Sequence, residues 1–319
     1  MDNGTVNEPR KPKSLVELSN VPQPFPYQGS KRKLAHAILP LLPTGTETLV
    51  EPFAGSAAIS IAARATGRAS SAAISDINGP LMNLWQAILD DPEGLALQYE
   101  KLWHAQKDDP KAFFLQVRDD FNRDHRPYQL LYLLNRCVKA AVRYGKDGNF
   151  NQSADNRRLG AKPQTTRERI FASSQTMAGS TVLAGDYTSL LHQARVNDVV
   201  YMDPPYQGVT NVSDHRYIAG LPRQEFEKEL LLAVKAGTSF IISYDAITDD
   251  NKYGEPLSSS LGLTHIHLDA GCSSQATLSG RDTKTVESLY LSPSLVDRLG
   301  GPDAVDAITA EESDDLLLV

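Results

Sequence analysis

The chain has 319 residues, of which 41% are hydrophobic and 22% charged, with a net charge of −7. This composition is typical of a globular protein. No apolar run approaches the roughly 20 residues that a membrane helix needs, and the polar segment Met1–Lys13 lacks the apolar core of a signal peptide. Cys137 and Cys272 lie far apart without metal-ligand spacing, so the sequence predicts a reduced, cytoplasmic protein without a metal site.

The net charge hides two opposite local charges. Residues 296–319 contain seven acidic residues and one basic residue, whereas residues 136–169 contain nine Lys or Arg and three acidic residues. Affinity for nucleic acid depends on positive charge that faces the phosphates, not on the overall sum. The basic stretch is therefore compatible with a polyanionic partner, and a solvated charged face is the alternative.

The first part of the chain alternates between strands and helices. After a flexible tail at residues 1–20, the pattern predicts a strand at 48–53, a helix at 57–65, a strand at 72–75 and a helix at 80–89. This order is typical of a parallel, doubly wound α/β sheet.

Residues 91–179 break this alternation and predict a mostly helical insertion. Helical apolar spacing occurs at 109–121 and 127–142, and a long polar loop follows at 144–163. Loops of this length are usually functional or disordered. The insertion contains the basic stretch.

The alternation then resumes. Strands are predicted at 181–184, 198–202 and 238–244, a helix at 222–235, and a closing antiparallel pair at 263–268 and 285–291. The predicted fold class is therefore α/β, with a catalytic domain formed by residues 21–90 and 180–295. Residues 296–319 are expected to form a poorly ordered acidic tail.

The strand predicted at 198–202 ends directly in Asp203-Pro204-Pro205-Tyr206. Ligands of open α/β sheets bind beyond the carboxyl ends of strands. The prolines fix a turn and donate no hydrogen bond, so their carbonyl oxygens are rigid acceptors beside the Asp203 carboxylate. Two acceptors facing an aromatic amino group would pull its nitrogen toward tetrahedral geometry and stabilise the developing charge. Tyr206 can stack on the aromatic ring that carries this amino group. A turn with an incidental acid is the alternative.

A second ligand-binding turn is predicted after the first strand, in Glu51 to Ala57. Gly55 would let a nucleoside cofactor approach the backbone, and the absence of G-x-G-x-x-G disfavours a nicotinamide dinucleotide. Asp76 ends the next strand, where an acid binds ribose hydroxyls, although a helix N-cap is the alternative. Upstream, Tyr27 and Lys31 would face a cofactor's sulfonium and carboxylate, or simply form a turn before a helix.

Together these motifs resemble the Dam-like DNA adenine methylases over residues 22–292. That family has a K-W-A-G-G-K-like segment, E-P-F-x-G-x-G, D-I-N, a target-recognition insertion and D-P-P-Y, in this order. The matching segments here are 26–31, 51–57, 76–78 and 203–206, with two further matches at 135–151 and 280–289.

The chain departs from the family pattern at three places. Ala57 replaces the second glycine of the cofactor turn, Gln152-Ser153 replaces Val-Pro, and the segment 242–245 lacks a histidine. A methyl group at position 57 narrows the turn slightly. These differences concern the DNA sequence recognised and the loop contacts, not the reaction.

The resemblance implies a Rossmann-like sheet with S-adenosyl-L-methionine as methyl donor. It also implies direct transfer to adenine N6 in double-stranded DNA after the base has been flipped out, with catalysis by Asp203 to Tyr206. The cofactor site would comprise Tyr27, Lys31, Glu51, Phe53, Gly55, Asp76, Asp186 and Asp203. For Asp186 a helix cap is an equal alternative. DNA would be contacted through phosphates and base edges by Asn135, Arg136, Lys139, Arg143, Asn149, Asn151, Arg157 and Arg158.

Two other functions stay open. The same chemistry serves RNA adenine or a protein glutamine, and a catalytically silent DNA-binding module would keep the fold. The basic insertion favours DNA, and the intact Asp203–Tyr206 segment and Lys31 favour catalysis. The recognition sequence, the oligomeric state and a restriction endonuclease partner are left open by the sequence.

Overall fold

The structure is a computed structural model that describes residues 18, 20–205, 221–248, 251–253, 255–272 and 284–315. Tyr206, nearly all of the N-terminal tail and the closing Gly-Arg turn at 280–281 therefore lie outside the described residues. Within the described part, no helix combines the length and apolar character needed to cross a membrane.

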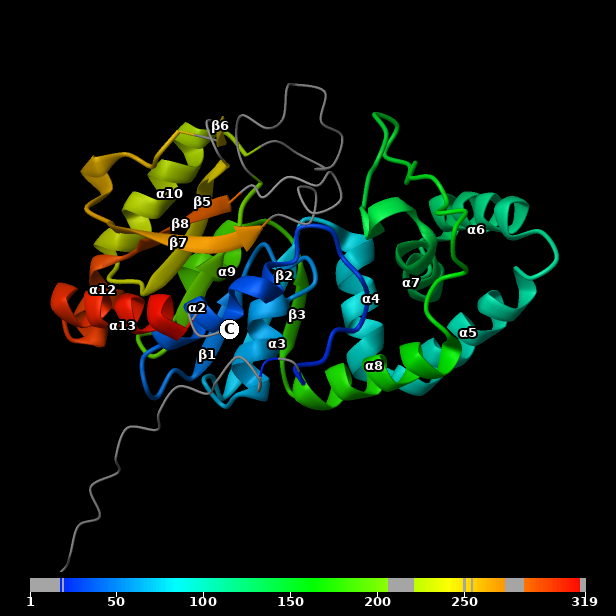
Figure 1. Cartoon of the computed structure of the whole chain (residues 1–319), viewed down its shortest axis with the longest axis horizontal. Helices are drawn as coiled ribbons and strands as arrows, with labels where there is room; N and C mark the ends of the chain where they lie inside the picture. The colour runs from blue at the N-terminus through cyan, green and yellow to red at the C-terminus, as the bar shows by residue number, and fades with distance from the viewer. Residues whose placement is uncertain are drawn as a thin grey trace, which may run out of the picture.

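A mixed sheet forms the centre of the molecule (Figure 1). Its seven main strands are ordered β3-β2-β1-β4-β5-β8-β7, and a short strand, β6, pairs with β5. The first five strands in this order are parallel, and β8 runs antiparallel to both β5 and β7. The strands are β1 Thr48–Glu51, β2 Ser71–Asp76, β3 Thr181–Ala184, β4 Val199–Met202, β5 Phe240–Thr248, β6 Asn251–Tyr253, β7 Thr264–Cys272 and β8 Lys284–Leu291. The α/β fold predicted from the sequence is confirmed.

Alternate residues of the central strands face two separate cores. In β4, Val199 and Tyr201 belong to one hydrophobic cluster, whereas Val200 and Met202 belong to the other. Since both faces of this strand are buried, its sequence is continuously apolar, as is usual for parallel strands. The first charged residue after this buried strand is Asp203, which directly follows its last residue, Met202.

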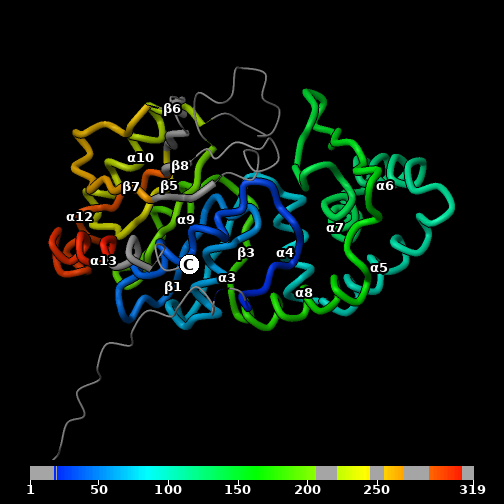
Figure 2. The backbone as a smooth tube through the Cα atoms, in the orientation of Figure 1, coloured from blue at the N-terminus to red at the C-terminus, as the bar shows by residue number. Residues whose placement is uncertain are grey.

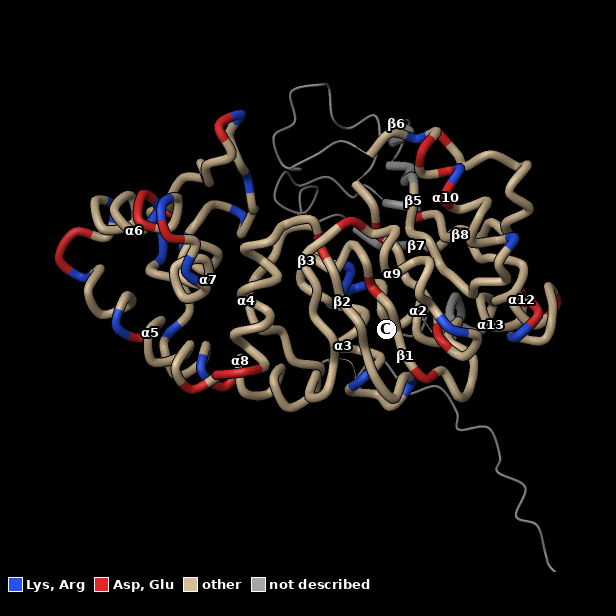
Figure 3. The backbone as a smooth tube through the Cα atoms, turned by 180° about the vertical axis from the view of Figure 1, so that it is seen from behind, with Lys and Arg blue, Asp and Glu red and all other residues tan. Residues whose placement is uncertain are grey.

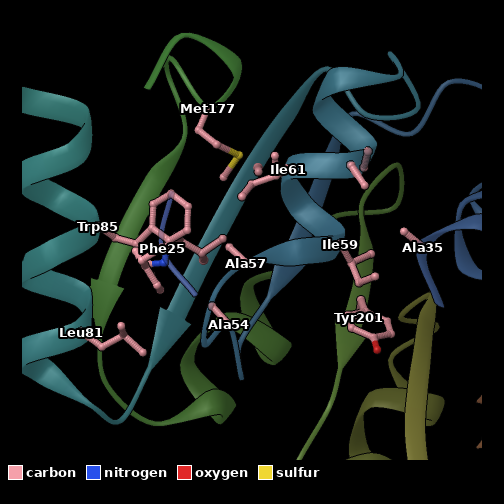
Figure 4. Close-up of a cluster of buried hydrophobic side chains, with 14 of the residues drawn as sticks. Phe25, Ala35, Ala54, Ala57, Ile59, Ile61, Leu81, Trp85, Met177 and Tyr201 are labelled. Atoms are coloured by element: carbon pink, nitrogen blue, oxygen red, sulfur yellow. The ribbon is translucent and has the colours of Figure 1, made fainter. Parts of the chain in front are cut away.

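Helices cover both faces of the sheet (Figure 2). The first cluster lies under α2 and α3, and the second under α9 and α10. Figure 4 shows Phe25, Ala54, Ala57 and Trp85 packed together in the first cluster, behind the turn that follows β1. The helices of this domain are α2 Ala35–Ile38, α3 Ala58–Ala65, α4 Gly79–Asp90, α9 Tyr187–Gln193, α10 Arg223–Lys235, α12 Pro293–Leu299 and α13 Pro302–Asp315, with the 3-10 helix η1 at Lys31–Leu34.

The predicted insertion is helical and gathers beside the β3 edge of the sheet (Figure 1). Its helices are α5 Pro92–Ala105, α6 Pro110–Asp124, α7 Pro127–Arg136 and α8 Pro163–Thr176. Each begins with a proline, and the carboxylates of Asp91 and Asp109 cap α5 and α6. The helix predicted at 127–142 ends earlier, at Arg136, and the predicted loop at 144–163 contains no named helix or strand before α8 begins at Pro163.

The insertion shares a core with the sheet. Helix α4 contacts β3 on one side and both α7 and α8 on the other. One cluster of buried residues runs from Ile74 in β2 to Tyr99, Phe121 and Leu131 in the inserted helices. The division into two domains therefore stays a prediction.

The prediction of a poorly ordered C-terminal tail at 296–319 is wrong over the residues described. Ser292 caps α12, Gly300 ends it with a φ of +104°, and Pro302 begins α13. Val305 is fully buried within the first cluster. Local helix signals and apolar anchors, Val296 as well as Val305, therefore outweigh the acidic composition of this segment.

Arg136 lies in the interior of the insertion rather than on its surface. Only 1% of it is exposed. Its guanidinium donates to Gln106 Oε1 at 2.7 Å, to the carbonyl oxygens of Asp155 at 2.8 Å and Pro110 at 3.3 Å, and to the carbonyl of Arg158. The prediction that Arg136 contacts DNA is therefore wrong for this conformation, because these bonds tie the long loop to α5, α6 and α7.

We expect Arg136→Met to lower the free energy of unfolding by about 3 kcal/mol, because several buried acceptors lose their donor. Arg143→Met is the matched control, since Arg143 is exposed, and should change stability by no more than about 0.5 kcal/mol. Urea unfolding of both variants measures the difference. Equal losses would show that the Arg136 bonds contribute little.

Candidate active site

The turn after β1 is held by hydrogen bonds at both of its sides. The Gly55 N–H donates to Asp76 Oδ2 at 3.0 Å, and the Gly55 carbonyl accepts from Trp85 Nε1 at 3.1 Å. Gly55 has a φ of +49°, and a Cβ atom there would lie 2.9 Å from the Tyr27 ring. Glycine therefore avoids strain in the backbone and allows the close approach of Tyr27, although Ala57 adopts the same φ in this turn.

Asp76 connects the ends of β1 and β2. Its second oxygen, Oδ1, accepts from the Asn78 N–H at 2.9 Å. The helix cap considered for Asp76 is instead Asn78, whose Oδ1 accepts from Leu81 N–H at 3.2 Å. Burial raises the pKa of Asp76, and the hydrogen bonds from Asn78 and Gly55 oppose this.

The aromatic side of the site is formed by Phe53. Its ring stacks on Tyr187 with centroids 5.1 Å apart and meets Phe226 edge to face at 6.4 Å. Asp186, the residue before Tyr187, caps α9 by accepting from the Thr188 N–H at 3.0 Å and its hydroxyl at 2.6 Å. The helix-cap alternative thus describes what Asp186 does here, and its cofactor contact stays a prediction.

A charged cluster lies at the end of β4. The Lys31 ammonium donates to both oxygens of Glu287, at 2.9 and 3.1 Å, and lies 3.5 Å from Asp203 Oδ1. The side chains of Lys31, Asp203 and Glu287 are only 12%, 21% and 13% exposed. Lys31 is therefore engaged by two carboxylates of the protein itself, and its predicted contact with a cofactor carboxylate stays a prediction.

Burial dominates the ionisation of the acidic groups at these strand ends. It raises the pKa of Asp203, Glu287 raises it further and Lys31 lowers it, so that the pKa is about 6. Burial also raises the pKa of Glu51 to about 7, although hydrogen bonds from Ser60 stabilise its charged form. Burial disfavours the Lys31 ammonium, but Asp203 and Glu287 outweigh this effect and raise the pKa of Lys31.

Glu51 also has a structural role. Its Oε2 accepts from the Ser60 N–H at 2.8 Å, so the carboxylate ties the end of β1 to the first turn of α3. Its pKa is also raised by the charge of Asp203. Glu51, which the sequence predicts at the cofactor site, is therefore close enough to interact electrostatically with Asp203 at the end of β4.

Glu287 is the residue of this cluster to which the sequence assigned no role. It lies in the segment 280–289 that matches the family pattern, but it is separated from Lys31 by 256 positions, and only the pairing of β8 in the sheet brings the two together. Its position in that segment was the one available signal.

The residues predicted to bind DNA fall into three groups. Asn135 is buried like Arg136 and donates to the Leu131 carbonyl at 2.9 Å. Lys139, Arg143 and Asn151 are exposed. The third group is also exposed, but its members contact acidic residues of the same loop. Asn149 donates to Asp147, and Arg157 and Arg158 both pair with Asp155.

Positive charge on the insertion is accordingly mixed with negative charge (Figure 3). Asp155 lies 3.0 Å from Arg157 and 3.1 Å from Arg158, measured between their nearest oxygen and nitrogen atoms. The insertion contacts the N-terminal segment at Ala140, whose carbonyl accepts a hydrogen bond from the Gln28 N–H at 3.0 Å. Lys139 and Arg143 are the exposed cations nearest to this contact in the sequence.

The sheet order, the glycine turn after β1 and the acid after β2 define a Rossmann-like methyltransferase. The chain belongs to the D12 class N6 adenine-specific DNA methyltransferase family, whose model matches residues 27–271.

Three relatives illustrate the similarity. The chain is 25% identical to the DNA N-6-adenine-methyltransferase of Escherichia phage P1 over 67% of its own length and 28% of that protein. It is 28% identical to the retron Ec67 DNA adenine methylase of Escherichia coli over 57% of its length and 62% of that protein. It is 26% identical to a type II methyltransferase of Lactococcus lactis subsp. cremoris over 59% of its length and 66% of that protein. The aligned part therefore spans less than two thirds of each relative.

We expect Gly55→Ala to destabilise the protein by more than Gly29→Ala. Both glycines have a positive φ, +49° and +87°, but an added Cβ at Gly29 meets no atom within 4 Å. Gly29→Ala should therefore cost only backbone strain, about 1–2 kcal/mol, whereas Gly55→Ala also displaces the Tyr27 ring. Urea unfolding compares the two, and equal losses would contradict the close packing of Tyr27.

Proposed function

We propose that this chain transfers a methyl group from S-adenosyl-L-methionine to N6 of adenine in double-stranded DNA. The proposal rests on one observation: the two segments that match the family motifs, after β1 and after β4, lie side by side. The turn at Glu51 to Ala57 follows β1, Asp203 follows β4, and β1 and β4 are neighbouring parallel strands. Their carboxyl ends therefore open at the same edge, where an open α/β sheet binds its ligands.

The residues around these ends fit S-adenosyl-L-methionine. Asp203 and Glu287 place two carboxylates at one ammonium, Lys31, and the charge of Asp203 also acts on a third carboxyl group, Glu51. An excess of negative charge suits a sulfonium cation. When bound, this cofactor supplies an electrophilic methyl group. Tyr27, Phe53 and Gly55 would line its site, and Asp76 would face its ribose.

Asp203 is the proposed catalytic residue. As a carboxylate it accepts a hydrogen bond from the adenine amino group, beside the acceptor carbonyls of the two prolines that follow. The N6 lone pair forms the new bond to the methyl carbon while the bond from carbon to sulfur breaks, and N6 then releases a proton. A pKa of about 6 makes Asp203 a better acceptor for that proton than an ordinary carboxylate.

The insertion is the proposed DNA-recognition element. Lys139, Arg143 and Asn151 are exposed and would reach phosphates or base edges. Arg157 and Arg158 share one carboxylate, Asp155, and would contribute the remaining positive charge of this group. The target base must leave the stack to reach Asp203, which costs a few kcal/mol. One relative is named a type II methyltransferase, and this name is the support for a restriction endonuclease partner.

We expect Asp203→Ala to reduce methyl transfer to duplex DNA by at least about a thousandfold, because it removes the acceptor at the reacting nitrogen. Incorporation of labelled methyl groups from S-adenosyl-L-methionine into genomic DNA measures this loss. Asp306→Ala, on the exposed side of α13, is the matched control and should keep wild-type activity. Labelling of RNA or protein in place of DNA would refute the proposed substrate.

We expect kcat/KM to fall as the pH drops through about 6, with the slope of a single proton. The pKa of Asp203 is raised to about 6, so the carboxylate prevails above this pH and is lost below it. Initial rates between pH 5 and 8.5, with circular dichroism to confirm that the protein stays folded, give the profile. Full activity at pH 5 would rule out an essential Asp203 carboxylate.

A further inference from the structure

We infer that Glu287 is a positioning residue for methyl transfer: it takes up the hydrogen bonds of the Lys31 ammonium and so leaves the Asp203 carboxylate available to the substrate amino group. This inference rests on the function proposed above and adds a role for β8 to it. Glu287 is not part of the Asp203–Tyr206 motif.

The geometry separates the two carboxylates by their distance from Lys31. Both oxygens of Glu287 lie at 2.9 and 3.1 Å from Nζ, as in a charge-assisted hydrogen bond. Asp203 Oδ1 lies at 3.5 Å, which is longer than such a bond. Lys31 is therefore close enough to favour the charge on Asp203, while its shorter bonds go to Glu287.

The fold holds Glu287 in this position. It lies on β8, between β5 and β7, where it is opposite Ala246 and Leu268. The pairing of β5 with β8 shifts register between Ser243 and Ala246, beside Glu287. Irregularities of this kind re-aim side chains next to active sites. The Ser243 hydroxyl also donates to Glu287 Oε2 at 3.4 Å, the oxygen that accepts from Lys31 at 2.9 Å.

Removing Glu287 would change the partner of Lys31. The charged groups that act on Asp203 or Lys31 come from four elements: Lys31 from η1, Glu51 from β1, Tyr201 from β4 and Glu287 from β8. Glu51 is committed to the start of α3 through Ser60. With Glu287 neutral, the ammonium would be drawn toward Asp203, which already lies 3.5 Å away, and would occupy the oxygens that the substrate needs.

The first experiment tests the contact without using activity. Lys31→Met, Glu287→Gln and the double variant form a cycle in urea unfolding. If the two groups interact as described, the double variant loses less stability than the sum of the single losses. Strictly additive losses would overturn the inference, because Glu287 would then not hold Lys31.

The second experiment tests the role in transfer. Glu287→Gln should lower kcat by about 10- to 100-fold, while KM for S-adenosyl-L-methionine changes by less than roughly threefold. Its acid limb should also move below that of the wild type, because loss of a neighbouring negative charge and closer approach of Lys31 both favour ionised Asp203. Loss of the Glu287 charge alone would move the limb but leave kcat unchanged well above it, so the two effects together identify the positioning role.

Glu227→Gln is the matched control. Glu227 lies on α10, pairs with Arg223 at 3.0 Å and is 21% exposed, so the same chemical change is made at a similar ion pair outside the site. It should keep the wild-type kcat and pH profile. An active wild type with an unshifted limb and an unchanged kcat in Glu287→Gln overturns the role of Glu287 alone, whereas a wild type that methylates no duplex DNA overturns the proposed function.

Discussion

The burial of carboxylates at the ends of neighbouring strands is the constraint on which this site depends. Glu51, Asp203 and Glu287 are all largely removed from water, and a buried charge is costly unless it is paired or hydrogen-bonded. Lys31 neutralises one of them and Ser60 stabilises another. Burial, together with the charge of Glu287, raises the pKa of Asp203.

The same cluster ties distant parts of the chain together. Lys31 comes from the N-terminal segment, Asp203 from the middle of the sheet and Glu287 from its antiparallel end. The segment that carries Lys31 also bonds to the insertion, through Gln28 and the carbonyl of Ala140. One backbone hydrogen bond and one ion pair therefore connect the insertion, through the segment of Gln28 and Lys31, with the carboxylate of Asp203.

The turn after β1 and the loop that precedes α8 use charge in different ways. At the turn, Asp76 spends its two oxygens on the backbone of Gly55 and Asn78, which fixes the shape of the site before any ligand arrives. In the loop, Asp155 neutralises part of the charge of Arg157 and Arg158 and keeps them together. Arg136 carries the same charge but is used for packing, because its planar guanidinium can bridge carbonyl groups of several elements at once.

The sequence by itself determined the fold class, the order of the elements and the two turns that flank the site. Apolar alternation, prolines at helix starts and the strand that ends in Asp203 are local signals, and local physics suffices to interpret them. The tertiary structure decided what depends on distance across the chain. It placed Arg136 in the interior, joined the acidic C-terminal helices to the core through Val305, and brought Glu287 to Lys31 across 256 positions. Such contacts depend on how the sheet closes, and no local pattern records which face of a strand meets which distant side chain.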